Sequence, residues 1–278
     1  MIDKQEINRR SNAEGLRFDQ IEKDYVILWI IRALDEPGLK PEGWVFKGGT
    51  CLRHCYYRGY RFSEDLDFSC RQVSERIDAA RKVIEAVVEW VREKSFLRLA
   101  MKSVSTIEGD FQVEIPVEYS RGGPRRHGLP EVKLHLTFDE PILTETAMRQ
   151  VTPVYSDLDA FSVCTYSKME ILAEKMRALL QQQLKWPRPR DLYDLWFILC
   201  HEGESFDWDK LRQLFSRKCQ VRKIDPDLGG LVSEGLRALN AQVWARQLEP
   251  VMAVVPDYEK VWCEWREFCG RAFGVKSI

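Results

Sequence analysis

One stretch of this chain constrains its fold more than any other. Residues 44–70 read W-V-F-K-G-G-T-C-L-R-H-C-Y-Y-R-G-Y-R-F-S-E-D-L-D-F-S-C. The apolar residues at its start predict a short strand, the paired glycines predict a tight turn, and the residues after them predict a short helix. A second strand is predicted around Asp65 and Asp67. The stretch therefore predicts a sheet in which a glycine turn and two carboxylates occupy adjacent segments.

The two aspartates carry the first chemical signal. Side chains two apart on a strand leave the same face, so Asp65 and Asp67 should lie side by side while Leu66 and Phe68 enter the core. Two ionised carboxylates at this spacing repel each other unless a cation lies between them. Because Mg²⁺ prefers oxygen ligands and keeps positions open for substrate phosphates, we expect Asp65 and Asp67 to hold Mg²⁺ in a metal-nucleotide site.

The glycine turn carries the second signal. Without a Cβ, Gly48 and Gly49 leave their amides open to an approaching anion, and Thr50 is a favourable helix N-cap. A lone G-G is usually only a turn, and a lone D-x-D is usually a solvated strand edge. Their conjunction favours a site that binds a nucleoside triphosphate (NTP), for which the candidate residues in this region are Lys47, Gly48, Gly49, Thr50, Arg61 and Ser63.

These motifs also resemble a known family. The segments F-K-G-G-T-C-L and R-F-S-E-D-L-D-F are similar to those of the AbiEii/AbiGii toxin family of nucleotidyltransferases, part of the polymerase-beta-like superfamily. The resemblance extends to E-K-D-Y at 22–25, to K-M-E-I-L-A-E-K-M-R-A-L-L at 168–180 and to R-D-L-Y-D-L-W at 190–196. It covers roughly the first 200 residues.

The resemblance implies an activity and partners. Relatives transfer a nucleoside monophosphate from an NTP to an acceptor hydroxyl with Mg²⁺, and the acceptor seen among them is the 3′ end of transfer RNA, which would block translation. A type IV toxin–antitoxin system also implies an antitoxin made as a separate protein. By resemblance, Lys175, with Lys168 as the alternative, contacts nucleotide phosphates, and Asp191 lies in the same cleft.

A third carboxylate of the superfamily has no clear counterpart. His135 occupies the expected position on the strand predicted at 131–138. Histidine can act as a base near neutral pH, but it is a poor Mg²⁺ ligand. Glu114 or Glu118 on the preceding predicted strand could supply the missing oxygen, and the sequence does not choose among the three.

The rest of the chain predicts an α+β domain followed by helices. Helices are predicted at 14–34 and 74–94, and strands at 96–106, 111–119 and 131–138, which with the core motif give a mixed sheet of about five strands. The strand pattern stops near 150–165. We therefore expect a nucleotidyltransferase domain at 1–160 and an α-helical domain at 161–278 that closes the cleft, with predicted helices from 167, from 190, and at 207–219, 229–248 and 257–272. Glu22, Lys23 and Asp24 fit the solvated face of the first helix, although the family resemblance keeps Lys23 and Asp24 of interest.

RNA contacts can come only from local clusters, because the net charge of −1 gives no global signal for a polyanionic partner. One cluster is the glycine-rich loop 121–130, which a solvated hairpin would explain equally well. The other is near residue 220. The candidate residues are Arg121, Arg125, Arg126, Arg217, Lys218, Arg222 and Lys223.

Two further expectations concern location and alternatives. The start M-I-D-K-Q-E-I-N-R-R has no apolar signal core and no run of about 18 apolar residues occurs, so we expect a cytoplasmic protein without a membrane partner. The eight cysteines include no C-x-x-C pair, which favours reduced thiols over a zinc site. The alternative functions are a module that binds nucleotide or RNA without transfer, and a transferase that acts on a small molecule or a protein.

Overall fold

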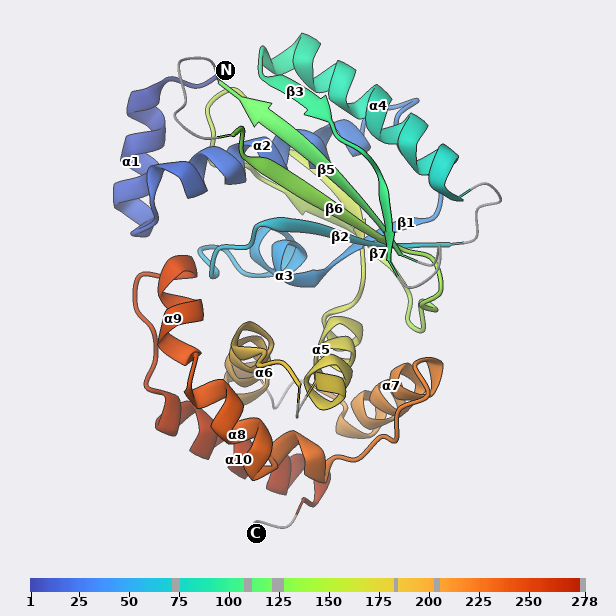
Figure 1. The fold of residues 1–278 in the computed structure, drawn as a ribbon, viewed down its shortest axis with the longest axis vertical. Coiled ribbons are helices and arrows are strands. Elements are labelled where there is room, and N and C mark those ends of the chain that lie inside the picture. The colour runs from blue at the N-terminus through green and yellow to red at the C-terminus, as the bar shows by residue number, and fades with distance from the viewer. Residues whose placement is uncertain (72–75, 108–111, 122–127, 183–184, 203–205, 276–278) are drawn as a thin grey trace. The chain divides into compact units, whose positions relative to one another are not determined.

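The computed structural model describes residues 1–71, 76–107, 112–121, 128–182, 185–202 and 206–275. The chain divides into two compact units, Met1–Tyr166 and Ser167–Ile278. The first unit contains a mixed sheet with helices, and the second consists of helices (Figure 1). The predicted α+β class with a helical C-terminal region is confirmed. The division at residue 166 lies beyond the boundary expected at 160, because the last strand still belongs to the sheet.

Among the described residues, eight strands form one sheet with the order β3-β5-β6-β2-β1-β8-β7, and β4 pairs with β5 outside this path. The pairs β1/β8 and β2/β6 are parallel, whereas β1/β2, β3/β5, β5/β6 and β7/β8 are antiparallel. The strands are β1 (Trp44–Lys47), β2 (Asp65–Cys70), β3 (Arg98–Met101), β4 (Ser105–Ile107), β5 (Gln112–Ser120), β6 (Glu131–Thr137), β7 (Ala147–Val151) and β8 (Phe161–Thr165).

The sheet is larger than the sequence predicted. The predicted strand 96–106 is two short strands, β3 and β4, and the sheet contains two further strands that the sequence did not predict, β7 and β8. The edge strand β7 exposes most of its residues and therefore has no alternation to detect. The strand β8 alternates, but over only five residues, and it is held by pairing with both β1 and β7.

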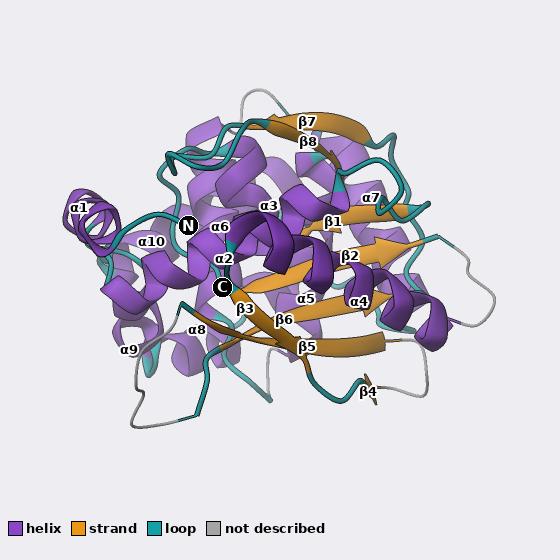
Figure 2. Cartoon of the chain, turned by 90° about the horizontal axis from the view of Figure 1, so that it is seen from above, coloured by secondary structure: helices purple, strands orange, loops and turns teal. Residues whose placement is uncertain are grey.

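Two long helices of the first unit, α2 (Phe18–Leu34) and α4 (Arg76–Ser95), cover one face of the sheet, and α1 (Lys4–Glu14) packs against α2. Gly15, with a φ of 66°, ends α1 and separates the predicted helix 14–34 into two elements. Figure 2 shows α2 and α4 lying over the same side of the strands. Leu66, Phe68 and Leu134 are buried, and strand alternation puts them on the face opposite Asp67 and His135.

The opposite face of the sheet carries the charged side chains. Because strand residues alternate, Lys47, Asp67, His135 and Glu114 lie on this face, in register across β1, β2, β6 and β5. A four-residue helix, α3 (Gly48–Cys51), packs against β2 on this side and continues directly into a π-helical turn, η1 (Leu52–Tyr56). The candidate site is therefore built on the face that α2 and α4 leave uncovered.

The second unit is a group of helices around an aromatic core. It contains α5 (Lys168–Gln182), α6 (Pro189–Glu202), α7 (Trp208–Val221), η3 (Gly229–Val232), α8 (Glu234–Ala241), α9 (Trp244–Leu248), η4 (Glu249–Val251) and α10 (Tyr258–Phe273). Trp244, Trp262 and Trp265 are buried. The predicted helix 229–248 is interrupted, because Ser233 caps α8 by accepting from the amide of Leu236.

Two general findings complete the fold. Among the described residues, none of the helices combines the length and apolar character needed to span a lipid bilayer. The eight cysteines are free thiols, and Cys51, Cys70, Cys219 and Cys269 are buried. Burial raises the pKa of Cys70 to about 12.

Candidate active site

The two aspartates of β2 lie side by side on the charged face, each partly exposed. Burial and the neighbouring Asp67 carboxylate both raise the pKa of Asp65. The cations His135 and Lys23 act in the opposite direction without cancelling this effect. The Asp65 carboxylate is therefore poorly compensated, as expected of a carboxylate that holds a cation.

The glycine turn is in direct contact with these carboxylates. Gly48 has a φ of +78°, and a Cβ at this position would lie 2.3 Å from Asp67 Oδ2. A Cβ on Gly49 would lie 2.8 Å from Ser63 Oγ and 3.0 Å from Arg61 Nη2. Both glycines are therefore needed for close approach, in addition to the positive φ of the first.

The turn is also tied to the strand. Thr50 is fully buried, and its hydroxyl donates to the backbone carbonyl oxygen of Asp65. The structure thus brings together Gly48, Gly49, Thr50, Arg61, Ser63, Asp65 and Asp67, as the sequence predicted for one site.

His135 lies between two carboxylates. Its Nδ1 is 3.2 Å from Asp67 Oδ1 and its Nε2 is 3.1 Å from Glu114 Oε2. Burial lowers the pKa of His135, but Asp67 and Glu114 raise it more strongly, to about 9. The two carboxylates therefore favour the protonated imidazole, which can donate to both of them.

The two glutamates of β5 differ in their relation to this site. Glu114 contacts His135 and Lys133, and although burial raises its pKa, these two cations lower it overall. Glu118 instead pairs with Lys102, at 3.0 Å. Of the two glutamates left open by the sequence, Glu114 is the one that the structure places next to His135.

Lys47 does not extend into open solvent beside the glycine turn. Its side chain is 9% exposed, its Nζ lies 3.7 Å from Glu140 Oε2, and it stacks over the ring of Tyr166 at 5.5 Å. Glu140 gave no signal in the sequence, because it lies outside any periodic element. The side chain of Lys47 is therefore held by its own partners on the charged face.

The donor set fits Mg²⁺. Asp65 and Asp67 offer carboxylate oxygens, and Mg²⁺ is commonly held by one or two carboxylates together with substrate phosphates and water. Within the described part of the chain, no cluster of three or more histidine, cysteine, aspartate or glutamate side chains is arranged to hold a metal ion. The pair suits a metal whose remaining ligands come from the substrate.

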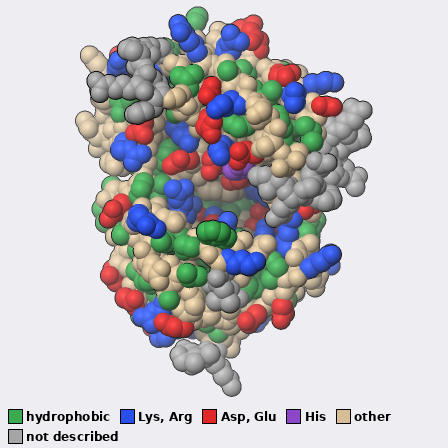
Figure 3. Space-filling view, viewed as in Figure 1, with side chains coloured by type: hydrophobic (Ala, Val, Ile, Leu, Met, Phe, Trp, Pro, Cys, Tyr) green, Lys and Arg blue, Asp and Glu red, His purple; other side chains and the backbone are tan. Residues whose placement is uncertain are grey.

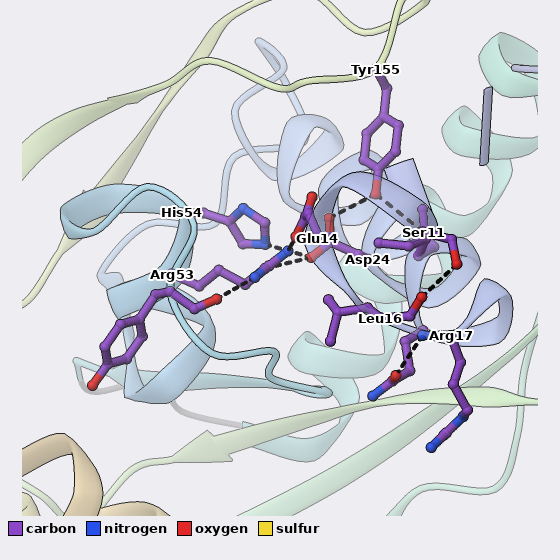
Figure 4. Close-up of polar contacts among 11 residues, drawn as sticks. Ser11, Glu14, Leu16, Arg17, Asp24, Arg53, His54 and Tyr155 are labelled. Carbon is purple, nitrogen blue, oxygen red and sulfur yellow. Dashed lines mark hydrogen bonds and ion pairs between the residues drawn. The ribbon is translucent and has the colours of Figure 1, made fainter. Parts of the chain in front are cut away.

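A second polar cluster of the first unit corrects the sequence interpretation of α2. Glu22 and Asp24 were interpreted as part of a solvated helix face, but both are buried, at 5% and 1% exposure. Asp24 contacts Arg53, His54 and Tyr155 (Figure 4). Lys23 instead pairs with Glu64, the residue before Asp65, with its Nζ 3.2 Å from Glu64 Oε2.

The second unit holds the predicted lysine and aspartate in contact. Lys175 Nζ lies 2.7 Å from Asp191 Oδ1 and 2.7 Å from Asp194 Oδ2. Arg188, which the sequence analysis did not single out, donates to Asp191 Oδ2 at 2.8 Å and its side chain is 40% exposed. Lys168 lies elsewhere, with its Nζ 5.6 Å from the centre of the Phe206 ring. Lys175, and not Lys168, therefore shares a cluster with Asp191.

The predicted RNA-binding residues are dispersed. Arg121 packs on the ring of Tyr25 and donates to the carbonyl oxygen of Ile2, while Arg125 and Arg126 lie outside the described residues. The prediction that Lys218 belongs to a surface cluster is wrong. Lys218 is fully buried, and its Nζ lies 2.8 Å from a carboxylate oxygen of both Glu170 and Glu174.

Of the remaining candidates, Arg217 and Lys223 are exposed and Arg222 is partly exposed. On the face drawn in Figure 3, basic and acidic side chains are interspersed. The exposed cations therefore form small local groups.

Comparisons with known proteins agree with this geometry. The sequence profile described as nucleotidyl transferase AbiEii toxin, Type IV TA system, matches residues 32–268. The solved structure of MenT4, a nucleotidyltransferase toxin from Mycobacterium tuberculosis H37Rv, superposes with a TM-score of 0.67 at 18% identity over 100% of this chain and 91% of that chain. JHP933 from Helicobacter pylori superposes with a TM-score of 0.56 at 20% identity over 93% and 94%. No curated protein sequence matches significantly.

Proposed function

Since the chain belongs to the AbiEii family of nucleotidyltransferase toxins from type IV toxin–antitoxin systems, we propose that it transfers a nucleoside monophosphate from an NTP to the 3′-terminal hydroxyl of transfer RNA and so blocks translation. The family also implies an antitoxin as the partner that counters the toxin. The proposal adds the metal, the acceptor and the residue roles to the family assignment.

The observation that carries the proposal is the contact between the glycine turn and the aspartates. A Cβ on Gly48 would lie 2.3 Å from Asp67 Oδ2, so the glycine turn and the candidate metal-binding carboxylate are in direct contact. Anions bind backbone amides, and Mg²⁺ bound to phosphates binds carboxylates. This arrangement supports a site for a metal-bound triphosphate.

In this proposal, different residues of the first unit bind the metal and orient the triphosphate. Asp65 and Asp67 would hold Mg²⁺, which when bound neutralises charge on the triphosphate. Gly48, Gly49 and Thr50 would orient the phosphates, with Arg61 and Ser63 beside Gly49. The acceptor hydroxyl oxygen forms a bond to the α-phosphorus, the bond from that phosphorus to the bridging oxygen breaks, and pyrophosphate leaves with the electron pair. The hydroxyl proton passes to a carboxylate or to water.

His135 and Glu114 stand where a third metal-binding carboxylate is usual. As a protonated imidazole held between two carboxylates, His135 would fix the orientation of Asp67 and add positive charge beside it. We assign it a positioning role and not the role of a base. Glu114 completes this row as the acceptor for the other ring nitrogen.

The second unit would contribute cations to the same reaction. Lys175 is already shared by two carboxylates, so its charge is largely compensated before substrate arrives. Arg188 is bonded to only one of these carboxylates in the described contacts and is more exposed. We propose that both cations serve phosphate binding and that Asp191 orients them.

A direct experiment tests donor and acceptor together. The protein is incubated with Mg²⁺, total cellular RNA and each α-³²P-labelled ribonucleoside triphosphate in turn, and the RNA is separated on a gel. We expect label in the transfer RNA band with at least one NTP. We expect no label when the 3′ ends of the RNA have been oxidised with periodate before the incubation. Label that persists on periodate-treated RNA, or that appears only on protein, would contradict the proposed acceptor.

One observation favours a second candidate, a nucleotide-binding module without transfer. The histidine in place of a third carboxylate removes an oxygen ligand that nucleotidyltransferases commonly use. Calorimetry separates the two functions, since this candidate requires tight NTP binding with no pyrophosphate release in the presence of RNA.

A further inference from the structure

The side chain of Arg53 connects four segments of the first unit. Arg53 lies in η1, and its side chain is 6% exposed. Its Nε donates to Asp24 Oδ1 on α2 at 3.0 Å, and its Nη2 donates to Glu14 at the end of α1. Its Nη1 donates to the backbone carbonyl oxygen of Tyr60. Figure 4 shows Glu14 and Asp24 beside the guanidinium of Arg53.

Asp24, the carboxylate that accepts from Arg53 Nε, has contacts with two further residues. We call the cluster of Arg53, Asp24 and their partners the hub. His54 Nε2 lies 3.2 Å from Asp24 Oδ1, and the hydroxyl of Tyr155 donates to Asp24 Oδ2 at 2.8 Å. Burial alone would raise the pKa of Asp24, but His54 and Arg53 hold it well below its ordinary value. Asp24 is therefore an ionised carboxylate whose two oxygens are both occupied.

Stability alone does not explain such a cluster. Burying ions costs solvation free energy, and well-packed apolar residues of similar volume often stabilise a protein as much or more. A π-helical turn such as η1 is likewise rare and is found frequently at functional sites. Both features indicate that the position of this segment matters.

The segment that Arg53 fixes is the one that carries the candidate phosphate-binding groups. The helical residues run without interruption from Gly48 to Tyr56, so Arg53 is only three residues beyond Thr50. The carbonyl of Tyr60 directly precedes Arg61, whose guanidinium faces Gly49. The hub thus holds both the chain that leaves the glycine turn and the chain that returns with Arg61 and Ser63.

The two carboxylates lie before the residues that the family profile matches, although Asp24 belongs to the E-K-D-Y segment that resembles the family. Glu14 and Asp24 precede residue 32, where the profile match begins, whereas Arg53 and His54 lie within it. The N-terminal helices therefore supply the anchoring charges for a loop in the matched region.

We propose that Asp24 and Arg53 are positioning residues that set the orientation of the glycine turn and of Arg61 and Ser63 for triphosphate binding. This inference rests on the proposed function for its ligand. Losing the anchor should let the turn reorient, and misplacement of about 1 Å at such a site can cost on the order of 100-fold. The effect should fall on the NTP and not on the acceptor.

Asp24→Asn tests the inference, because it removes the charge and keeps the shape. ATP, GTP, CTP and UTP with Mg²⁺ are titrated calorimetrically, and the nucleotide that binds wild type most tightly is used in the transfer assay. We expect Kd and KM for that nucleotide to rise at least about 10-fold, with kcat within about threefold and KM for RNA unchanged. Asp24→Glu, which keeps the charge, should recover part of the loss.

Hydrogen exchange gives a readout that does not require activity. The amides of residues 48–63 should exchange several-fold faster in Asp24→Asn without nucleotide. Val91→Ala is the control, because Val91 is fully buried in α4 and belongs to no polar cluster. It should lower the thermal stability without accelerating exchange selectively in 48–63. If Asp24→Asn does not fold, Tyr155→Phe, which removes one hydrogen bond to Asp24, takes its place with the same readouts.

The outcomes separate the two proposals. Wild-type protein that binds no nucleotide would refute the proposed function, while the exchange comparison would still decide whether Asp24 positions the turn. A folded Asp24→Asn protein with wild-type exchange at 48–63, or with changes no different from those of Val91→Ala, overturns the inference.

Discussion

Asp67 and Asp24 lie in the same unit, and both face a histidine, but their surroundings are opposite. Asp67 is 34% exposed and lies beside another carboxylate whose pKa is raised. Asp24 is buried, and its cationic neighbours lower its pKa. The first arrangement leaves carboxylates that gain from an added cation, whereas the second already contains its cations. The partly exposed Asp65 and Asp67 pair is suited to binding a cation, whereas the buried Asp24 and Arg53 cluster is suited to holding segments of the chain together.

The largest effect is expected from a substitution that disrupts the Asp65 and Asp67 pair. Asp65→Ala should reduce transfer by on the order of 10³-fold, because one of two metal-holding carboxylates is lost. The thermal midpoint should stay the same or rise, since the repulsion between Asp65 and Asp67 disappears. The labelled-NTP assay and a thermal melt measure the two quantities. Wild-type transfer by a well-folded variant would exclude Asp65 from the mechanism.

The next largest effect is expected from a substitution that disrupts the buried cluster of Asp24 and Arg53. Arg53→Met should lower the free energy of unfolding by about 3–5 kcal/mol, because it leaves Asp24 buried without its main partner. Urea denaturation monitors the change. Lys102→Met is the matched control: Lys102 also lies between two carboxylates, Glu118 and Glu131, but at an exposed position. A loss in the control as large as in Arg53→Met would show that burial is not what distinguishes the cluster.

The contact between glycine and aspartate gives a third, smaller effect. Gly48→Ala places a methyl group in the left-handed region, which costs about 1–2 kcal/mol, and also forces it against Asp67. Gly38→Ala has a φ of +89° but no neighbour within 4 Å, so it carries the backbone cost alone. We expect similar backbone destabilisation, with loss of NTP binding only in Gly48→Ala. Equal NTP binding by both variants would argue against a phosphate site at this turn.

The smallest effect concerns pH. Because the folded-state pKa of Asp24 lies below its unfolded value, its ionisation stabilises the protein above the unfolded pKa of about 4, and this contribution is lost as the pH falls further. The stability difference between wild type and Asp24→Asn should therefore be full at pH 7 and shrink below about pH 4. Urea midpoints at pH 7, 5 and 3.5 measure it. A difference that stays constant over this range would contradict an ionised Asp24 in the folded protein.

Local sequence patterns brought together the residues of the candidate site but gave no signal for the contact between Asp24 and Arg53. Strand alternation placed Asp65 and Asp67 on one face, and the paired glycines preceded a helix, so the relevant residues lie close in the chain. Asp24 and Arg53 are 29 residues apart, and their contact depends on how α2 packs. The helix α2 is buried on nearly all sides, so a charged residue on it cannot be assigned to solvent by periodicity.

The same limit applies to the second unit. Lys218 follows Arg217 in a basic segment and was interpreted with it, although only one side of α7 faces solvent. A local charge count does not register that Glu170 and Glu174 lie on a neighbouring helix, at 2.8 Å from the lysine. Tertiary packing, which periodicity does not encode, decides which member of such a cluster is buried.

The π-helical turn η1 makes chain length at this point as important as residue identity. A π-turn contains one residue more than an α-turn, and Arg53 and His54 both reach Asp24 from it. Removing a single residue between Leu52 and Tyr56 would restore α-helical winding and change the directions in which the side chains at Arg53 and His54 leave the axis. Homologues that keep both Asp24 and Arg53 should therefore carry no insertion or deletion within this turn, even where its other residues vary.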